Sequence, residues 1–263
     1  MQSVWLLVST CIVPIITYAS ETWHTTKQEE KKLNQMLDKI LRRILMTPDG
    51  TPREALYIET GLLDIATTAD SKRLNMKARI NREKSELMTQ ILSNPQCMWE
   101  QDTAKTMTHY GLEPEELTGS RYQTKATVKR AISTKYRMKL DQSAQGKSKM
   151  EYFMEAKNNW QPEKRAQYMN ELTRKQTSLI FKARTRMLKV KSNYKNGHPN
   201  LTCKMCKTEE ETQTHILEEC PVVHPDETNK IPKHQLFSED TGTLREIAIK
   251  IGKIQEKLDE VVC

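Results

Sequence analysis

Three cysteines and one histidine lie close together near the carboxyl end of the chain, in the stretch TCKMCKTEEETQTHILEEC. Cys203 and Cys206 are separated by two residues. His215 follows after eight more residues, and Cys220 follows after a further four. A Cys-x2-Cys turn brings two thiolates within reach of one ion, and the other two side chains can complete a tetrahedron around it. Mixed thiolate and imidazole donors favour Zn²⁺, so the spacing predicts a structural zinc site with no position open to a catalytic water.

Three other interpretations of this cluster stay open at the level of sequence. The four residues could have come together by chance, or the cysteines could form disulfides in a secreted chain. His224 could also replace His215 as the nitrogen ligand. Chance is the weaker explanation, because four of the ten Cys and His residues that follow Met88 fall within 18 positions and include a Cys-x2-Cys pair. We therefore expect a metal site.

A set of basic side chains lies just before the cluster and could contact the phosphates of a nucleic acid. Its members share one cationic face of a helical pattern: Arg174, Lys175, Lys182, Arg184, Arg186, Lys189 and Lys191. Contacts to phosphate supply affinity without base specificity. We expect these residues to bind RNA or single-stranded DNA, with the alternative that they form an ordinary solvated helix surface.

The net charge is concentrated in the segment that contains this set. The chain has 263 residues, with 42 Lys and Arg against 34 Asp and Glu, for a net charge of +8. Residues 121–195 have 20 basic against 5 acidic side chains, which gives +15, whereas residues 207–263 have 7 against 13, which gives −6. A concentrated basic segment is typical of proteins that bind a phosphate backbone.

The composition predicts a mainly α fold. Only 8 Gly and 3 Phe occur, whereas Lys, Glu, Gln, Met and Leu are frequent, and this bias favours helices over strands. It argues against β-sandwiches and glycine-rich nucleotide-binding folds, and six cysteines are too sparse for a disulfide scaffold. The sequence contains no Asp-Asp pair and no local signature of a nucleophilic triad. We therefore expect a binding protein rather than an enzyme.

Apolar spacing predicts four long helices, at residues 27–46, 67–92, 161–190 and 244–261. Thr51 and Glu54 form a capping-box pattern for a short helix between the first two, and Gly61 is placed to end it. The last helix has an apolar stripe with spacings of three and four residues: Leu244, Ile247, Ile251, Ile254, Leu258 and Val261. We expect the stripe to pack on its own chain, with self-association through it as the alternative.

The first residues contain an apolar run, Val4 to Tyr18, that could be a signal peptide, a membrane anchor or a buried segment. No basic residue precedes the run, although a secretory signal requires one. The run is also shorter than the roughly 20 residues of a membrane span, and Pro14 interrupts it. A buried core segment is the interpretation that we favour, and it predicts an intracellular protein with no membrane partner.

Two parts of the chain resemble the carboxy-terminal region of non-LTR (LINE-type) retrotransposon reverse transcriptases. The stretches IVPIITYASETW, KKLNQMLDKILRRIL and TPREALYIETGLLDI resemble the region that follows the palm. The stretches RTRMLKVKSNY and CKMCKTEEETQTHILEEC resemble the CCHC cysteine–histidine knuckle of the same polyproteins. The two matches stand in the order that the family has, and together they cover a little under half of the chain.

The resemblance, taken together with the composition and the charge pattern, divides the chain into four segments. Residues 1–94 would be a thumb-like helical bundle in which Val4 to Tyr18 is a buried helix kinked near Pro14. Residues 95–195 would be a basic, helical and partly disordered connector, residues 196–224 the zinc knuckle, and residues 225–263 an acidic tail with an amphipathic helix.

The resemblance also implies a function and a location. The thumb and knuckle would handle nucleic acid during target-primed reverse transcription, in an intracellular and possibly nuclear setting. The family's palm, with its catalytic aspartates, would lie upstream of Met1, and no residue of this chain matches those aspartates. We therefore expect a nucleic-acid-binding remnant that is not catalytic alone. The rival hypothesis is a helical protein–protein interaction module that associates through its C-terminal helix.

Overall fold

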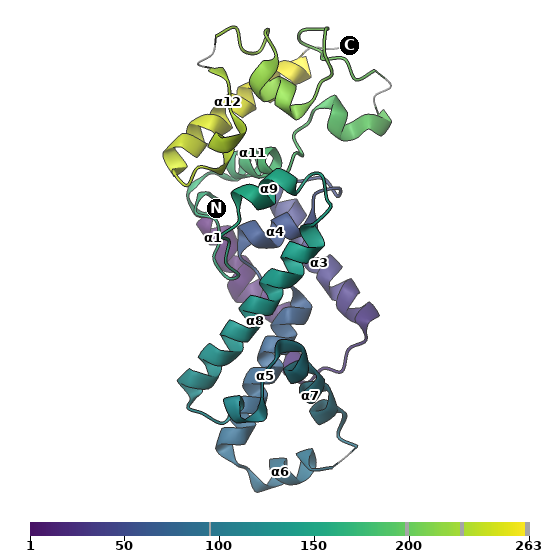
Figure 1. Ribbon diagram of the computed structural model, residues 1–263, viewed down its shortest axis with the longest axis vertical. Coiled ribbons are helices and arrows are strands. Elements are labelled where there is room, and N and C mark those ends of the chain that lie inside the picture. The colour runs from purple at the N-terminus through teal and green to yellow at the C-terminus, as the bar shows by residue number, and fades with distance from the viewer. Residues whose placement is uncertain (95, 198–199, 227–228, 261–263) are drawn as a thin grey trace.

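The computed structural model describes residues 1–94, 96–197, 200–226 and 229–260, and it confirms the mainly α fold (Figure 1). Within these ranges the only β pairing is an isolated antiparallel bridge between Thr202 and Glu210. The helices are α1 (Gln2–Leu7), α2 (Val13–Ile16), α3 (Lys27–Leu45), α4 (Arg53–Thr60), α5 (Ile65–Glu83), α6 (Glu86–Leu92), α7 (Met98–Tyr110), α8 (Arg121–Ala144), α9 (Glu151–Ala156), α10 (Tyr168–Glu171), α11 (Arg174–Arg184) and α12 (Thr241–Glu260).

The N-terminal apolar run forms an interrupted helix. A π-helical segment, η1 (Val8–Ile12), separates α1 from α2. It ends two residues before Pro14, whose ring nitrogen has no hydrogen to donate to the preceding turn. Trp5 is fully buried, and its indole nitrogen donates to the carbonyl oxygen of Met169 at 2.9 Å. The opposite face remains exposed, with Ile15 and Tyr18 each more than 70% accessible. The expected buried segment is thus buried along one face only.

The short helix α4 begins differently from the expected capping box. Pro52 is its N-cap, and the hydroxyl of Thr51 donates to the carbonyl oxygen of Pro48 instead of capping α4. The carboxylate of Glu54 accepts hydrogen bonds from Ser143 in the last turn of α8 at 2.5 Å and from Lys147, just beyond that helix, at 2.7 Å. Packing against α8 therefore orients this carboxylate. The capping-box pattern predicts instead that it accepts a hydrogen bond from a backbone amide.

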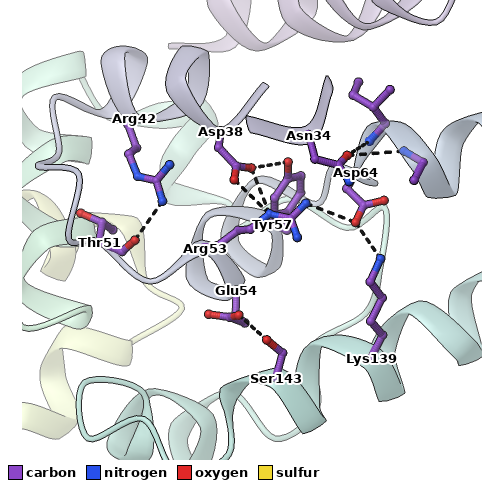
Figure 2. Close-up of polar contacts among 12 residues, drawn as sticks. Asn34, Asp38, Arg42, Thr51, Arg53, Glu54, Tyr57, Asp64, Lys139 and Ser143 are labelled. Atoms are coloured by element: carbon purple, nitrogen blue, oxygen red, sulfur yellow. Dashed lines mark hydrogen bonds and ion pairs between the residues drawn. The ribbon is translucent and has the colours of Figure 1, made fainter. Parts of the chain in front are cut away.

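A buried polar network joins α3, α4, α5 and α8 (Figure 2). Asp38 of α3 accepts from the Tyr57 hydroxyl at 2.6 Å and pairs with Arg53 at 3.0 Å. Asp64, the N-cap of α5, pairs with Arg53 at 3.3 Å and with Lys139 of α8 at 2.9 Å. Both carboxylates are buried. Since a buried charge is costly unless it is paired, these contacts fix how the four helices meet.

Two hydrophobic cores are connected by α5 and α8. The smaller core lies between α5, α7 and α8 at one end of the molecule, and the larger one extends from α1 to α12. Helix α8 supplies Val128 to the smaller core and Tyr136 to the larger one. The connector segment (residues 95–195), which we expected to be partly disordered, thus contains helices α7 to α11. The larger core takes residues from all four predicted segments, among them Leu37, Phe181, Ile216 and Ile251.

The helix predicted at residues 67–92 is divided. Helix α5 ends at Lys84, which has a left-handed conformation with φ of 47°, and α6 follows as a separate helix. None of the helices in the described ranges is both long enough and apolar enough to cross a membrane.

The C-terminal amphipathic helix packs on the chain itself. Helix α12 begins at Thr241, and it lies against α11 and α10 (Figure 1). Every described residue of its apolar stripe is buried: Leu244, Ile247, Ile251, Ile254 and Leu258. Val261 lies outside the described residues. The stripe through which the rival hypothesis has the chain self-associate is therefore covered by residues of the same chain.

Candidate metal centre and nucleic-acid interface

A tight backbone turn places the first two cysteines of the cluster. The bridge between Thr202 and Glu210 closes the turn, and the amide of Cys203 donates to the carbonyl oxygen of Glu209 at 2.7 Å. Lys207 has φ of 60°, and its amide donates back to the carbonyl oxygen of Cys203 at 3.0 Å. Cys206 is brought alongside Cys203 by this reversal of the chain.

The other two members of the cluster come from the next helical turn. The π-helical segment η5 (His215–Glu219) begins at His215 and ends at Cys220, whose amide donates to the carbonyl oxygen of His215 at 2.7 Å. The wider turn of a π-helix places side chains five residues apart on nearly the same side. The imidazole and the third thiol therefore face the turn that carries Cys203 and Cys206.

The four ligand atoms have the spacing of a tetrahedral site. All lie within 4.8 Å of one another, and the Sγ of Cys206 is 3.3 Å from the Nε2 of His215. Zn–S bonds of about 2.3 Å place the sulfur atoms of a tetrahedron roughly 3.8 Å apart, which agrees with this arrangement. Cys203, His215 and Cys220 are buried and Cys206 is partly exposed. The cluster that the sequence predicts is therefore brought together, and it could hold a metal ion.

The thiols have contrasting environments in the absence of an ion. Burial raises the pKa of Cys203 to about 11, whereas a hydrogen bond from the hydroxyl of Thr208 lowers the pKa of Cys206 to about 6. A divalent cation would stabilise both thiolates at neutral pH, because ligand deprotonation accompanies metal binding. The donor set of three thiols and one imidazole suits zinc better than a hard cation.

The remaining polar groups around the histidine favour the same ligand set. The Nδ1 of His215 lies 3.0 Å from a carboxylate oxygen of Glu209, on the side away from Cys206. The two groups are close without a hydrogen bond of normal geometry, so the carboxylate of Glu209 is placed where it could orient a metal-binding imidazole. The Nε2 of His224 is instead within 2.9 Å of the carbonyl oxygen of Ile216. His224 does not belong to the four-residue cluster, so its role as a substitute ligand is not supported.

The cluster is joined to the helical core. Cys203, Cys220 and Ile216 belong to the larger hydrophobic core. The side-chain amide of Gln213, two residues before His215, donates to the carbonyl oxygen of Ala183 in α11 at 2.7 Å. A metal ion bound here would fix the position of α11 and leave no ligand position for water. The arrangement is therefore suited to a structural role.

One of the predicted phosphate contacts is an internal ion pair. Arg184 is 3% exposed, and it lies 2.9 Å from the carboxylate of Glu59 in α4. Its Nε donates to the carbonyl oxygen of Leu236 at 2.6 Å, and its guanidinium covers the rings of Tyr168 and Phe237. The prediction that Arg184 contacts phosphate is wrong, because the side chain has no access to a ligand of that size and its charge is already paired.

Five further members of the set are engaged by neighbouring groups or partly buried. Arg174 donates to the last carbonyl oxygens of α3, at Arg43 and Ile44. Lys175 pairs with Glu256 at 3.1 Å, and Lys189 pairs with Asp259 at 2.6 Å, both on α12. The ammonium group of Lys191 donates to the carbonyl oxygen of Thr202 at 2.6 Å, and burial lowers the pKa of Lys182.

Arg186 differs from these members because it is exposed and its side chain has no ion-pair or hydrogen-bond partner in the described part of the chain. The basic residues that follow one another in the sequence therefore do not form one continuous cationic surface, because acidic residues of α12 lie among them.

Helix α8 has a set of exposed cations that we did not single out from the sequence. A buried stripe repeats every four residues along one face: Thr124, Val128, Ile132, Tyr136, Leu140 and Ala144. Outside it lie four exposed cations that form no ion pair among the described residues: Arg121, Lys125, Arg130 and Lys135. With 24 residues the helix is about 36 Å long. The signal was present in the charge of residues 121–195, but weak amphipathicity hid which face is buried.

Comparisons with protein-family models, with curated proteins and with solved structures find no match to this chain.

Proposed function

We propose that this protein binds RNA or single-stranded DNA through the exposed cations of α8, on a helical scaffold that a structural zinc ion completes. The observation that carries the proposal is the set of exposed, unpaired cations Arg121, Lys125, Arg130 and Lys135 on the solvent side of one long helix. Unpaired cations attract a phosphate backbone because their binding releases condensed counterions. Cations that already have a carboxylate partner, such as Lys175 and Lys189, gain less from the same contact.

Tyr122 adds a second feature that favours a single strand. Its side chain is 84% exposed on α8, next to Arg121. An exposed aromatic ring among cations can stack on an unpaired base, and such stacking tolerates any base. Substituting Tyr122 separately from the cations tests whether the ring contributes to binding or is only a solvent-exposed side chain.

The resemblance to LINE-type reverse transcriptases supports the proposal from the sequence. It fits a region that holds nucleic acid next to a separate catalytic palm, in an intracellular or nuclear setting. We propose binding without catalysis for this chain, since no residue corresponds to the family's catalytic aspartates.

A gel-shift series in rising salt tests the nucleic-acid proposal. We expect the full chain to bind a single-stranded oligonucleotide at low salt. Replacing the four α8 cations by Gln should flatten the slope of log K against log salt by about 3, since each lost contact to a single strand contributes roughly 0.7. Tyr122→Ala should weaken binding at every salt concentration and leave the slope unchanged.

The matched control for the α8 variant is a protein in which Lys175 and Lys189 are replaced by Gln, because both have carboxylate partners on α12. We expect a much smaller change in slope for this control. Absence of binding at low salt, or an equal effect of the two sets, would refute the assignment to α8.

The metal proposal is tested by elemental analysis of the purified chain. We expect one zinc per chain, lost in Cys203→Ser and Cys220→Ser and retained in Cys97→Ser, since Cys97 is a free cysteine distant from the cluster in sequence. Zinc-free unmodified protein, purified without chelator, would remove the metal from the proposal.

A further inference from the structure

A cavity of about 310 Å³ lies between the segment that follows α9 and the start of α12. One wall is the loop that runs from Lys157 to Gln167, and the other includes Arg184, Phe237 and Ser238. Its volume is at the lower end of the range for small-molecule sites. It contains neither the zinc cluster nor the exposed cations of α8, so the proposed function does not account for it.

The loop on the first wall is held in place by the C-terminal end of α4. The amide of Ala166 donates to the carbonyl oxygen of Glu59 at 2.9 Å, and the Nε of Arg165 donates to the carbonyl oxygen of Thr60 at 3.3 Å. Gly61 has φ of 66°, and a Cβ there would lie 2.7 Å from the backbone nitrogen of Arg165. The loop therefore packs directly on the backbone of Gly61, and the wall of the cavity is fixed before any ligand arrives.

The cavity has more cationic than anionic side chains. Lys157, Lys164, Arg165 and Arg184 line it, whereas Glu239 at the rim and the buried Glu59 supply the carboxylates. Arg184 forms an ion pair with Glu59, whose carboxylate also lies 4.0 Å from the ammonium group of Lys157. Lys164 and Arg165 form no ion pair within the described residues.

Arg165 is a partly buried cation without an acidic partner. Its Nε and Nη1 donate to Thr60 and Asn170, and its guanidinium lies over the ring of Trp5. Burial lowers the pKa of Arg165, because nothing compensates for the lost hydration of the charge. The Nη2 of this guanidinium makes no hydrogen bond in the described part of the chain, so it is free to bind an anion.

A buried hydroxyl completes the lining. Tyr168 is 2% exposed, and its hydroxyl makes no hydrogen bond of normal geometry among the described residues, although the carboxylate of Glu59 and the guanidinium of Arg184 lie close to it. Burial, reinforced by the nearby carboxylate of Glu59, raises the pKa of Tyr168 well above its ordinary value, so the oxygen keeps its proton. An unsatisfied buried hydroxyl destabilises a protein, and a ligand oxygen within the cavity would satisfy it.

We propose that this cavity binds the phosphate group of a phosphate monoester, with Lys164 and Arg165 as the charged contacts and the Tyr168 hydroxyl as a donor. Two cations without carboxylate partners match a dianionic phosphate better than a carboxylate, and a guanidinium is well suited to its oxygens. The monoester is either a small phosphorylated metabolite or the 5′-phosphate of an oligonucleotide. The proposal does not depend on nucleic-acid binding by α8.

Calorimetric titration of the full zinc-loaded chain with inorganic phosphate tests the site. We expect saturable binding at one site per chain. Lys164→Gln and Tyr168→Phe should each weaken it by about tenfold, which corresponds to the loss of one charge-assisted hydrogen bond. Lys31→Gln on α3 is the matched control, because it removes the same charge from an exposed position elsewhere, and it should leave phosphate affinity unchanged.

Tyr168→Phe also separates a binding role from a structural one. It keeps the buried ring and removes only a hydroxyl that makes no hydrogen bond of normal geometry, so the thermal stability of the free protein should stay the same or rise. A variant that is as stable as the unmodified chain and yet binds phosphate more weakly supports the proposal. Equal phosphate affinity in the unmodified chain, Lys164→Gln and Tyr168→Phe would overturn it.

Competition distinguishes the two sources of phosphate. If inorganic phosphate displaces a 5′-phosphorylated oligonucleotide more readily than the unphosphorylated one, the site takes a nucleic-acid end. If inorganic phosphate displaces the two oligonucleotides equally poorly but displaces a bound mononucleotide, the site takes a small metabolite. Absence of saturable binding up to about 10 mM phosphate would refute the proposal, even where the salt-dependent gel shift succeeds.

Discussion

Replacing Arg184 by Ala should destabilise the whole protein rather than weaken nucleic-acid binding selectively. The guanidinium is 1% exposed and the carboxylate of Glu59 is fully buried, with 2.9 Å between Nη1 and the nearer carboxylate oxygen. Removing one partner of a buried pair leaves an uncompensated charge and costs about 3–5 kcal/mol. Lys157, at 4.0 Å, offsets a small part of that cost. The contacts of Arg184 with the rings of Tyr168 and Phe237 are lost as well.

The expected loss is a large fraction of the roughly 5–15 kcal/mol that stabilises a typical domain. For a chain of this size it corresponds to a decrease in Tm of about 6–20 °C, measured by circular dichroism at fixed zinc concentration. A double variant, Glu59→Leu with Arg184→Met, removes both charges and keeps most of the volume. Because a well-packed apolar pair can replace a buried ion pair, the double variant should recover most of the lost stability.

The control is Arg186→Ala, two residues away on the surface, which should change Tm by less than about 2 °C because exposed substitutions rarely alter stability by more than 0.5 kcal/mol. The reasoning would be refuted if Arg184→Ala kept the Tm of the unmodified chain and selectively lost oligonucleotide binding. That result would restore the sequence-based assignment of Arg184 to the nucleic-acid interface.

Three further predictions follow from the buried contacts. Ile251→Asp should destabilise the monomer by several kcal/mol, because it places a charge at a fully buried position; a soluble variant with unchanged thermal stability would contradict this. Gly61→Ala should cost about 1–3 kcal/mol in urea denaturation, since its Cβ would overlap the backbone of the loop at Arg165. Burial acts to raise the pKa of Asp64, but Lys139 and the hydrogen bonds from Thr67 outweigh it and lower the pKa. Its contribution to the free energy of unfolding is therefore present above the unfolded pKa of about 3.9 and is lost as pH falls through the lower folded value. Asp64→Asn should flatten that acid limb, and an unchanged limb at matched zinc occupancy would show that Asp64 does not contribute.

The features that depend on local spacing could be predicted from the sequence alone. The stripe of α12, the stop at Gly61 and the convergence of Cys203, Cys206, His215 and Cys220 each require residues within about twenty positions of one another. Helical periodicity and metal-ligand spacing are local properties, so a linear pattern is enough to predict them. The mainly α fold follows from the same local preferences.

Tertiary structure alone decided which charges are available to a ligand. Arg184 and Arg186 are two residues apart, yet one is paired with Glu59, 125 positions away, and the other is exposed. The acidic tail folds back onto α11 and neutralises Lys175 and Lys189. The four α8 cations Arg121, Lys125, Arg130 and Lys135 have no such partner among the described residues. The cavity beside Arg165 depends in the same way on contacts between distant segments. Electrostatic energies depend on distance and burial in space, and a linear sequence gives neither quantity.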